Sequence, residues 1–172
     1  MIDYEQLSAT QAQQLLPQLC DVLQACVADG GSIGFIDATD RDVIARFWQD
    51  RIDSLARGNC DLLVARQQGV VVATVMVNNS GMPNGRHRAE ISKLLVLPLA
   101  RRQGIARQLM QQAELRAQAQ GKTLLVLDTR SGDVASELYR SLGWQVAGSI
   151  PFYAESTEGV FEATTVMFKV LQ

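Results

Sequence analysis

A cluster of arginines and small residues follows an aliphatic stretch near the middle of the chain, and its composition suits an anion site. Residues 94–97 read Leu-Leu-Val-Leu, and Arg101, Arg102 and Gly104 follow within a short turn. From residue 105 onward, apolar side chains recur at helical spacing. The first N–H groups of a helix have no intrahelical partner, and the helix dipole is positive at that end. The pattern therefore predicts a site where the main chain binds a pyrophosphate.

The spacing in this turn excludes two common nucleotide-binding motifs. A P-loop needs a longer glycine-rich loop that ends in Gly-Lys-Ser/Thr, and a dinucleotide site needs three glycines and an acidic residue about twenty positions later. Neither pattern follows residue 97. The sequence therefore favours a different ligand that carries a pyrophosphate.

Two separate segments resemble the GNAT acyltransferase superfamily. Arg101, Gly104 and Ala106 match its acetyl-CoA signature, Arg/Gln-x-x-Gly-x-Gly/Ala. Further on, an apolar stretch ends at Asp128. The segment that starts at Tyr139 is similar to the superfamily's Tyr-x-x-x-Gly-aromatic pattern. The resemblance implies contacts to acetyl-CoA from the end of the strand, the basic turn and the two helices that follow: Leu95, Val96, Arg101, Arg102, Gln103, Gly104, Ile105, Ala106, Arg107 and Ala135.

Two carboxylates are candidates for the chemistry of acetyl transfer to an amine. A lysine-like amine is neutral in roughly one molecule in 10³ at pH 7, so a base or a water relay assists the attack. Glu90 stands on a mostly apolar strand, where it is either functional or paired with a residue such as Arg86 or Lys93. Asp128 either lies beyond a strand end, where ligands bind in open α/β sheets, or starts the next helix.

The remaining steps need a proton donor for the thiolate and a donor for the oxyanion. Tyr139 either protonates the thiolate or is an ordinary half-buried tyrosine. A backbone N–H near Leu95 or Val96 is the simplest oxyanion donor. His87 stands between two arginines, which suppress its basicity, so we expect it at a solvated position or at the rim of the substrate site.

The hydrophobic pattern predicts the elements that must position these residues. Apolar stripes at helical spacing, with polar caps and glycine stops, predict four helices, over residues 8–27, 39–57, 105–120 and 132–142. Apolar or alternating runs predict strands over residues 2–6, 60–66, 70–77, 89–97, 123–128, 144–150 and 163–170, with a long connection at 151–161. This order predicts an α/β fold with a partly parallel, mixed sheet in one domain over residues 1–172.

Composition and charge narrow the classes of partner. The 172 residues carry a net charge of -2, which argues against nucleic acid as an obligate partner. Cys20, Cys26 and Cys60 lack metal-ligand spacing, so we expect buried reduced thiols and no metal. The beginning of the sequence has no basic and apolar signal pattern, and no apolar run is long enough to span a membrane. We therefore expect a cytoplasmic protein.

A narrower resemblance, to the tabtoxin-resistance acetyltransferases within the superfamily, extends over most of the chain. It includes Gly30, Gly31, Pro83, Asn84, Gly85, Arg88, Ala89, Leu97, Pro98, Leu127, Thr129, Val134 and Pro151 besides the site residues. The resemblance implies a GNAT fold of about seven strands and four helices, splayed between the strands that end at Val96 and Asp128, with acetyl-CoA in the V. It also implies substrate contacts from Gly34, Phe35, Glu90, Asp128 and Tyr153.

Two functions remain open at this point. In the first, the chain is an N-acetyltransferase that moves the acetyl group of acetyl-CoA to a small amine in a direct ternary complex. Glu90 and Asp128 then assist removal of the amine proton, and Tyr139 protonates the CoA thiolate. The acceptor is an amino acid, a dipeptide or a toxin-like or antibiotic-like amine, and resistance is one role for such an enzyme. In the second, the chain is a non-catalytic acyl-CoA-binding regulatory module. A homodimer through residues 151–161 or the final strand would cover an exposed edge.

Overall fold

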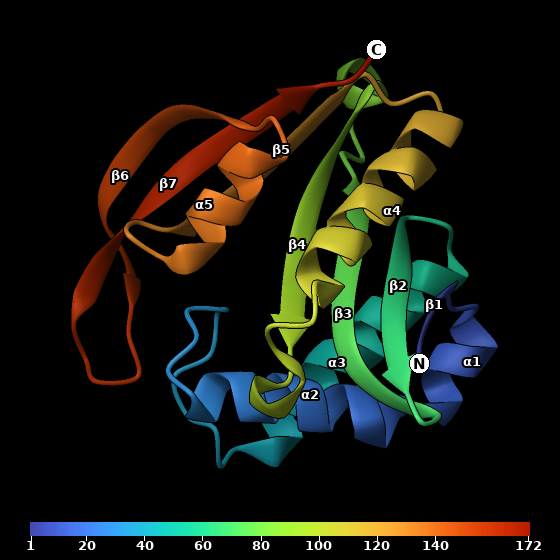
Figure 1. Cartoon of the computed structure of the whole chain (residues 1–172), viewed down its shortest axis with the longest axis vertical. Coiled ribbons are helices and arrows are strands. Elements are labelled where there is room, and N and C mark those ends of the chain that lie inside the picture. Colours follow the sequence, from blue (N-terminus) through green and yellow to red (C-terminus); the bar gives the residue numbers. More distant parts are fainter.

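Seven strands form one mixed sheet in the order β1-β2-β3-β4-β5-β7-β6, and five α-helices cover it (Figure 1). The computed structural model describes residues 1–172. The strands are β1 (Ile2–Gln6), β2 (Cys60–Gln67), β3 (Val70–Asn79), β4 (Arg88–Val96), β5 (Leu124–Arg130), β6 (Gln145–Glu155) and β7 (Phe161–Val170). The helices are α1 (Ala9–Gln14), α2 (Leu16–Ala28), α3 (Arg41–Ala56), α4 (Ile105–Ala119) and α5 (Val134–Ser141). The predicted α/β class and mixed sheet are confirmed.

The sheet splays at its centre, as predicted. β4 and β5 are its one parallel pair, and they pair only over Arg88 to Glu90, opposite Leu124 to Val126. Beyond these residues the two strands diverge, which Figure 1 shows as a widening gap between β4 and β5. The backbone groups on that side of β4 are therefore left without a strand partner and are available to a ligand.

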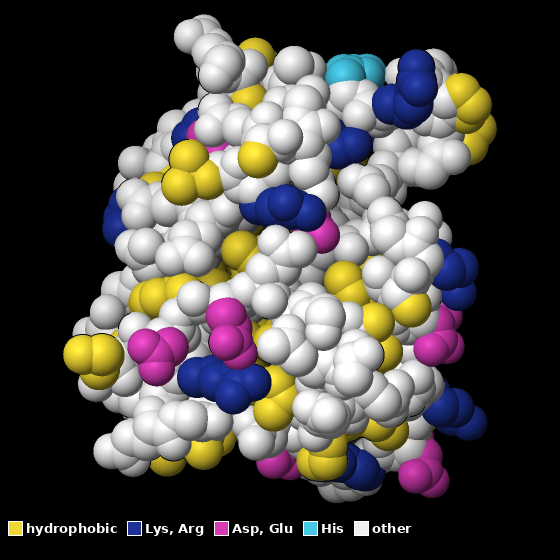
Figure 2. All heavy atoms as spheres, turned by 90° about the vertical axis from the view of Figure 1, so that its right-hand side faces the viewer, with side chains coloured by type: hydrophobic (Ala, Val, Ile, Leu, Met, Phe, Trp, Pro, Cys, Tyr) yellow, Lys and Arg dark blue, Asp and Glu magenta, His cyan; other side chains and the backbone are white.

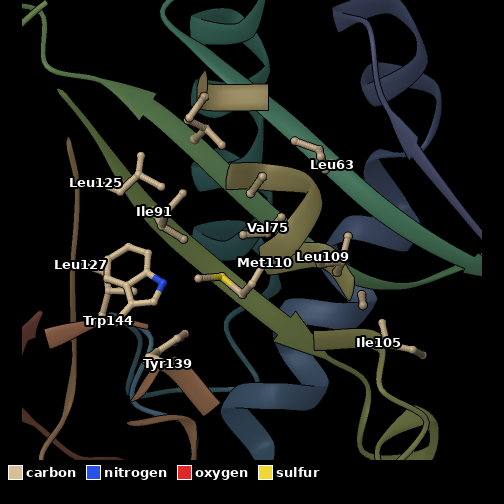
Figure 3. Packing of buried hydrophobic residues seen from close by; sticks show 14 of the residues in the cluster. Leu63, Val75, Ile91, Ile105, Leu109, Met110, Leu125, Leu127, Tyr139 and Trp144 are labelled. Carbon is tan, nitrogen blue, oxygen red and sulfur yellow. The ribbon is translucent and has the colours of Figure 1, made fainter. Parts of the chain in front are cut away.

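Helices cover the two faces of the sheet and enclose two hydrophobic cores. The stripe on α4 predicted from the sequence, which includes Ile105 and Leu109, packs on one face together with Tyr139 and Trp144 near α5. Figure 3 shows this core from close by. Helices α1 to α3 cover the other face around the fully buried Trp48. All three cysteines are buried and unpaired, as expected.

Two predicted element boundaries are wrong, and both lie at or near a proline. The helix predicted over residues 8–27 is two helices, α1 and α2, with Pro17 in the first turn of α2. Proline lacks the N–H that a continuous helix needs and clashes with the preceding turn. The strand predicted to end at residue 150 continues through Pro151 to Glu155, because a bulge between Ile150 and Ala154 accommodates the proline on an edge strand.

The surface is mixed in charge on the face that Figure 2 shows. Lysine and arginine side chains lie there among aspartate and glutamate side chains, and no continuous basic surface forms. None of the helices combines the length and the apolar character that crossing a bilayer requires.

Candidate active site

The turn between β4 and α4 places unpaired backbone donors at a cavity. Gly104 is the N-cap of α4 with φ +76°, a conformation that favours glycine, and no side chain caps the helix. The first helical hydrogen bond from this end runs from Gln108 N to Gly104 O (3.1 Å), so the three preceding N–H groups, at residues 105–107, have no protein partner. A Cβ on Gly104 would point into open space. The helix start is therefore open to an anion.

Most of the predicted acetyl-CoA contacts share this cavity of about 200 Å³. Its lining is Val96, Ala100, Arg101, Arg102, Gly104, Ile105, Ala106, Arg107 and Leu138. Ala100 and Leu138 were not among the predicted contacts, although Ala100 lies in the predicted turn and Leu138 precedes Tyr139 on the predicted helix. Three predicted residues are not part of the lining. Leu95 is buried in the core under α1 to α3, Gln103 donates to the carbonyl of Ala100 (3.1 Å), and Ala135 packs at the edge of the core under α4.

The arginines at the cavity differ in how they are held. Arg101 Nη1 lies 2.6 Å from Asp29 Oδ2, which ties the turn to the end of α2. Arg107 Nη2 donates to Ser141 Oγ on α5 (2.8 Å). The exposed Arg102 has φ +65° and no such partner. Arg102 is therefore the cation that is most available to a bound phosphate.

Glu90 and Asp128 lie on one face of the sheet where β4 and β5 begin to part. Glu90 pairs in register with Val126, and Asp128 follows two residues later on the same face of β5. Glu90 forms no ion pair with Arg86 or Lys93, so the structural alternative for it is not observed. Burial raises the pKa of Glu90, and the carboxylate of Asp128 raises it further, while Lys93 lowers it. This environment makes Glu90 a stronger base than an ordinary glutamate.

Asp128 is held by a buried hydroxyl rather than by a helix start. Its Oδ2 accepts a hydrogen bond from Thr164 Oγ1 on β7 (2.8 Å). The N-cap of α5 is Asp133, so the alternative that Asp128 initiates this helix is wrong. The second carboxylate oxygen remains free to meet a ligand at the splay.

Tyr139 lies in the core between α5 and the sheet with its hydroxyl unbonded to the protein. The residue is 7% exposed, and its ring lies 6.1 Å from that of Trp144. Figure 3 shows the two side chains next to Leu127. Burial, helped by the carboxylates of Asp133 and Asp128, raises the pKa of Tyr139 to about 12. At neutral pH the phenol is therefore protonated and is a hydrogen-bond donor.

A second cavity, of about 320 Å³, lies between the α2–α3 connection and the β6–β7 hairpin. Gly34 and Phe35 line it, as does Arg130, which the sequence analysis missed. Arg130 Nη1 donates to the carbonyl of Gly30 (3.1 Å), and its Nη2 lies 2.9 Å from Asp133 Oδ1. The predicted contact Tyr153 does not line this cavity, because it lies on the exposed part of β6.

Lys93 is a further residue whose importance the sequence did not reveal. It lies at a bulge of β4 with φ +52°, and its ammonium is 5.1 Å from the centre of the Phe47 ring on α3. Burial lowers its pKa, whereas Glu90 and Asp128 raise it. The only sequence signal was a lysine three residues after Glu90 on an apolar strand. His87 is exposed, as expected.

The comparison with protein families decides which family this architecture represents. A sequence model described as the acetyltransferase (GNAT) family matches residues 22–144. The chain belongs to the GNAT family. An uncharacterized N-acetyltransferase from Azospirillum brasilense is 31% identical to this GNAT chain over 117 residues, 67% of this chain and 68% of that one. The predicted superfamily is thus confirmed.

Solved structures of other proteins show the same fold. The ribosomal-protein-alanine N-acetyltransferase from Brucella melitensis superposes with a TM-score of 0.80 at 23% identity, covering 98% of this chain and 99% of that one. The structure of yncA from Salmonella typhimurium, solved with its cofactor acetyl-CoA, has a TM-score of 0.80 at 20% identity, and the match covers 100% of this GNAT chain and 95% of that one. At these identities the likeness establishes the fold.

Proposed function

We propose that this GNAT protein is an acetyl-CoA-dependent N-acetyltransferase that acts on a small amine in the cytoplasm. The observation that carries the proposal is the uncapped start of α4, whose unpaired N–H groups open into a cavity beside the splayed strands. Family membership supports the reaction class, and the Salmonella relative was solved with acetyl-CoA. The narrower resemblance to tabtoxin-resistance acetyltransferases remains a prediction about the acceptor.

The residues present fit acetyl-CoA, which supplies the activated acetyl thioester when bound. The N–H groups at the start of α4 and the side chain of Arg102 are placed to hold its pyrophosphate. The unpaired side of β4 offers backbone groups to its amide-containing arm. Leu97 N donates to Val72 O on β3 (2.8 Å), and successive N–H groups of a strand alternate in direction. Val96 N–H therefore points toward the open side, which favours Val96 over Leu95 as the oxyanion donor.

The two carboxylates provide a site for the amine. They attract a protonated amine by charge, and Glu90, with its raised pKa, is the better placed of the two to accept a proton. Asp128, fixed by Thr164, orients the amine from the opposite strand. Proton removal thus occurs between β4 and β5, next to the thioester that Val96 positions.

Tyr139 contributes a hydrogen bond to the departing sulfur. Its phenol, with a pKa of about 12, holds a proton more tightly than a thiol, whose ordinary pKa is about 8.5. The phenol therefore stabilises the thiolate as a donor, and complete transfer of its proton is uphill. This argument refines the role expected for Tyr139 from the resemblance.

A thiol-release assay tests the proposal directly. Acetyl-CoA is offered with a panel of amines, amino acids and dipeptides, and calorimetric titration measures the binding of acetyl-CoA alone. We expect CoA release that depends on the amine and falls sharply in Asp128→Asn. Tight binding of acetyl-CoA without turnover across the panel would favour the regulatory module, and absence of binding would contradict both functions.

A further inference from the structure

Lys93 is a half-buried cation that lacks an ion pair, which is unusual inside a fold. Lysine is almost never fully buried without a partner, and Lys93 is buried in part. Lys169, by contrast, has an ion-pair partner, because its Nζ lies 2.9 Å from Glu114 Oε1. The Lys93 ammonium instead lies over the Phe47 ring, 5.1 Å from its centre, and forms no hydrogen bond with the protein. Its hydrogen-bonding capacity is therefore unused.

A bulge in β4 places Lys93 on the face of the sheet that carries the two carboxylates. Thr74 pairs with Leu95 and Met76 with Ser92, so β4 holds one more residue than β3 between these points. The positive φ of Lys93 belongs to this bulge, and its side chain reaches α3. Glu90 lies on the same face, because it pairs with Asn78 while Ile91 points into the opposite core.

Ser92 adds a second unused donor at the same place. Its Oγ accepts a hydrogen bond from Asn78 Nδ2 (2.7 Å), and no acceptor in the protein receives its own O–H. Ser92 lies between Glu90 and Lys93 along β4. The face thus presents two negative groups, one cation and one hydroxyl, none of which neutralises another by direct contact.

We propose that Lys93 and Ser92 bind a carboxylate of the acceptor, so that the enzyme acts on an amino acid rather than on a plain alkylamine. The inference rests on the proposed N-acetyltransferase function. The amine of such a zwitterion meets Glu90 and Asp128, while its carboxylate meets the ammonium and the hydroxyl. Arg51 on α3 is already paired with Asp50 at 2.7 Å. A diamine or polyamine brings a second cation toward Lys93 and is rejected by charge.

The test compares an amino acid with its carboxamide, which keeps the amine and side chain but lacks the carboxylate. For each acceptor, kcat/KM is measured by CoA release in the wild type and in Lys93→Met, and the acid-to-amide ratio is formed within each protein. This ratio cancels differences in protein concentration and folding. We expect the ratio to fall about 10- to 100-fold in Lys93→Met, mainly through KM of the acid.

Three further variants make the test selective. Lys93→Arg restores most of the ratio, because it returns a cation at the same place. Ser92→Ala lowers the ratio by about 3- to 10-fold, the effect of one neutral donor. Lys122→Met removes the same charge two residues before β5, where Lys122 Nζ donates to the carbonyl of Arg86 (2.8 Å), and we expect it to keep the wild-type ratio.

Two results overturn the inference in distinguishable ways. Equal losses for acid and amide in Lys93→Met would show that Lys93 acts on the carboxylates or on the fold, and the N-acetyltransferase function would stand. If acetyl-CoA binds but neither the acids nor the amides cause any release of CoA, the proposed function fails and this inference fails with it.

Discussion

At Glu90 we expect activity and stability to respond in opposite directions. Its pKa is raised, so the folded protein binds this proton more tightly than the unfolded chain. At neutral pH the ionised carboxylate therefore costs folding free energy. Glu90→Gln removes that cost together with the base. We expect kcat/KM to fall about 10²-fold and the Tm at pH 7 to rise. The rise is less than about 2 °C, because Glu90 is only partly buried and solvent screens its charge.

The pH dependence checks the sign of this argument. The stability gain of Glu90→Gln is fully present above the folded pKa and shrinks as the pH falls through it. The gain is lost below about 4.3, the ordinary value for glutamate, where both states of the wild type become protonated. Thermal melts of both proteins between about pH 4 and pH 8 measure it. A gain that grows toward acid pH would show that Glu90 is stabilised, not strained, by its neighbours.

Tyr139→Phe isolates the hydrogen bond that we assign to the phenol. The hydroxyl makes no bond to the protein, so its removal leaves no partner unsatisfied and the Tm is nearly unchanged. We expect kcat to fall about 10- to 100-fold, as for the loss of one charge-assisted donor. Stopped-flow or steady-state CoA release measures kcat, and calorimetry checks that acetyl-CoA still binds. A large loss of Tm would instead assign the hydroxyl a structural role.

At the scale of elements, the start of α4 should bind acetyl-CoA mainly through charge. A side chain at Gly104 points into open space but must adopt the left-handed conformation, which strains any other residue. Gly104→Gln and Gly104→Glu carry the same bulk and the same strain. We expect Gly104→Glu to raise the Kd for acetyl-CoA at least about 10-fold beyond Gly104→Gln, because it adds a negative charge where the pyrophosphate lies.

Calorimetric titration of both variants at low and high salt measures this difference. The gap between them should narrow with salt, because ions screen exposed charges over about 8 to 10 Å at moderate ionic strength. Circular dichroism confirms that both variants are folded. Equal affinities for the two variants would show that no phosphate lies at the start of α4.

The elements show which parts of the structure the sequence could predict. The strand, turn and helix around Gly104 were predictable because each signal is local: an apolar run, a basic turn and a helical stripe. The extension of β6 past Pro151 was not, since it depends on pairing with β7 across a bulge. The sequence suggested Lys93 only as a possible partner of Glu90, and its unpaired position was missed for the same reason. Successive side chains of a regular strand point to opposite faces of the sheet, but a bulge interrupts this alternation. The face to which Lys93 points therefore cannot be predicted from its position in the strand.

The sequence identified several residues of the candidate site, but it could not predict how they are arranged in space. Each predicted residue had its own signal in the sequence. Glu90 is a carboxylate on an apolar strand, Asp128 stands at a strand end, and Tyr139 belongs to the family resemblance. Their arrangement depends on the register between β4 and β5, which are separated by a whole helix in the chain. Arg130 and Leu138 carried no chemical signal of their own, because their positions at the cavities follow from tertiary packing.

At the scale of the whole molecule, the β6–β7 hairpin exposes apolar side chains that a second copy would cover. Figure 1 shows the hairpin at one end of the sheet, where β6 is an edge strand. Its exposed apolar residues are Val146, Ile150, Phe152, Tyr153, Val160, Phe161 and Val170. Exposed apolar side chains beside an unpaired strand edge favour association. We therefore propose the homodimer expected from the sequence, with the hairpin at its interface.

Light scattering coupled to gel filtration tests this dimer. We expect a mass of twice the 18.9 kDa chain at concentrations of about 10 µM and above. In Phe152→Asp/Phe161→Asp, two carboxylates replace rings that are 78% and 61% exposed, so the fold is retained and the dimer is lost. Neither residue lines the cavities, so loss of activity in the monomer would show that the second copy supports the site. A monomeric wild type at about 100 µM would contradict the proposal, because the apolar side chains of the hairpin would then be exposed to solvent without a second copy.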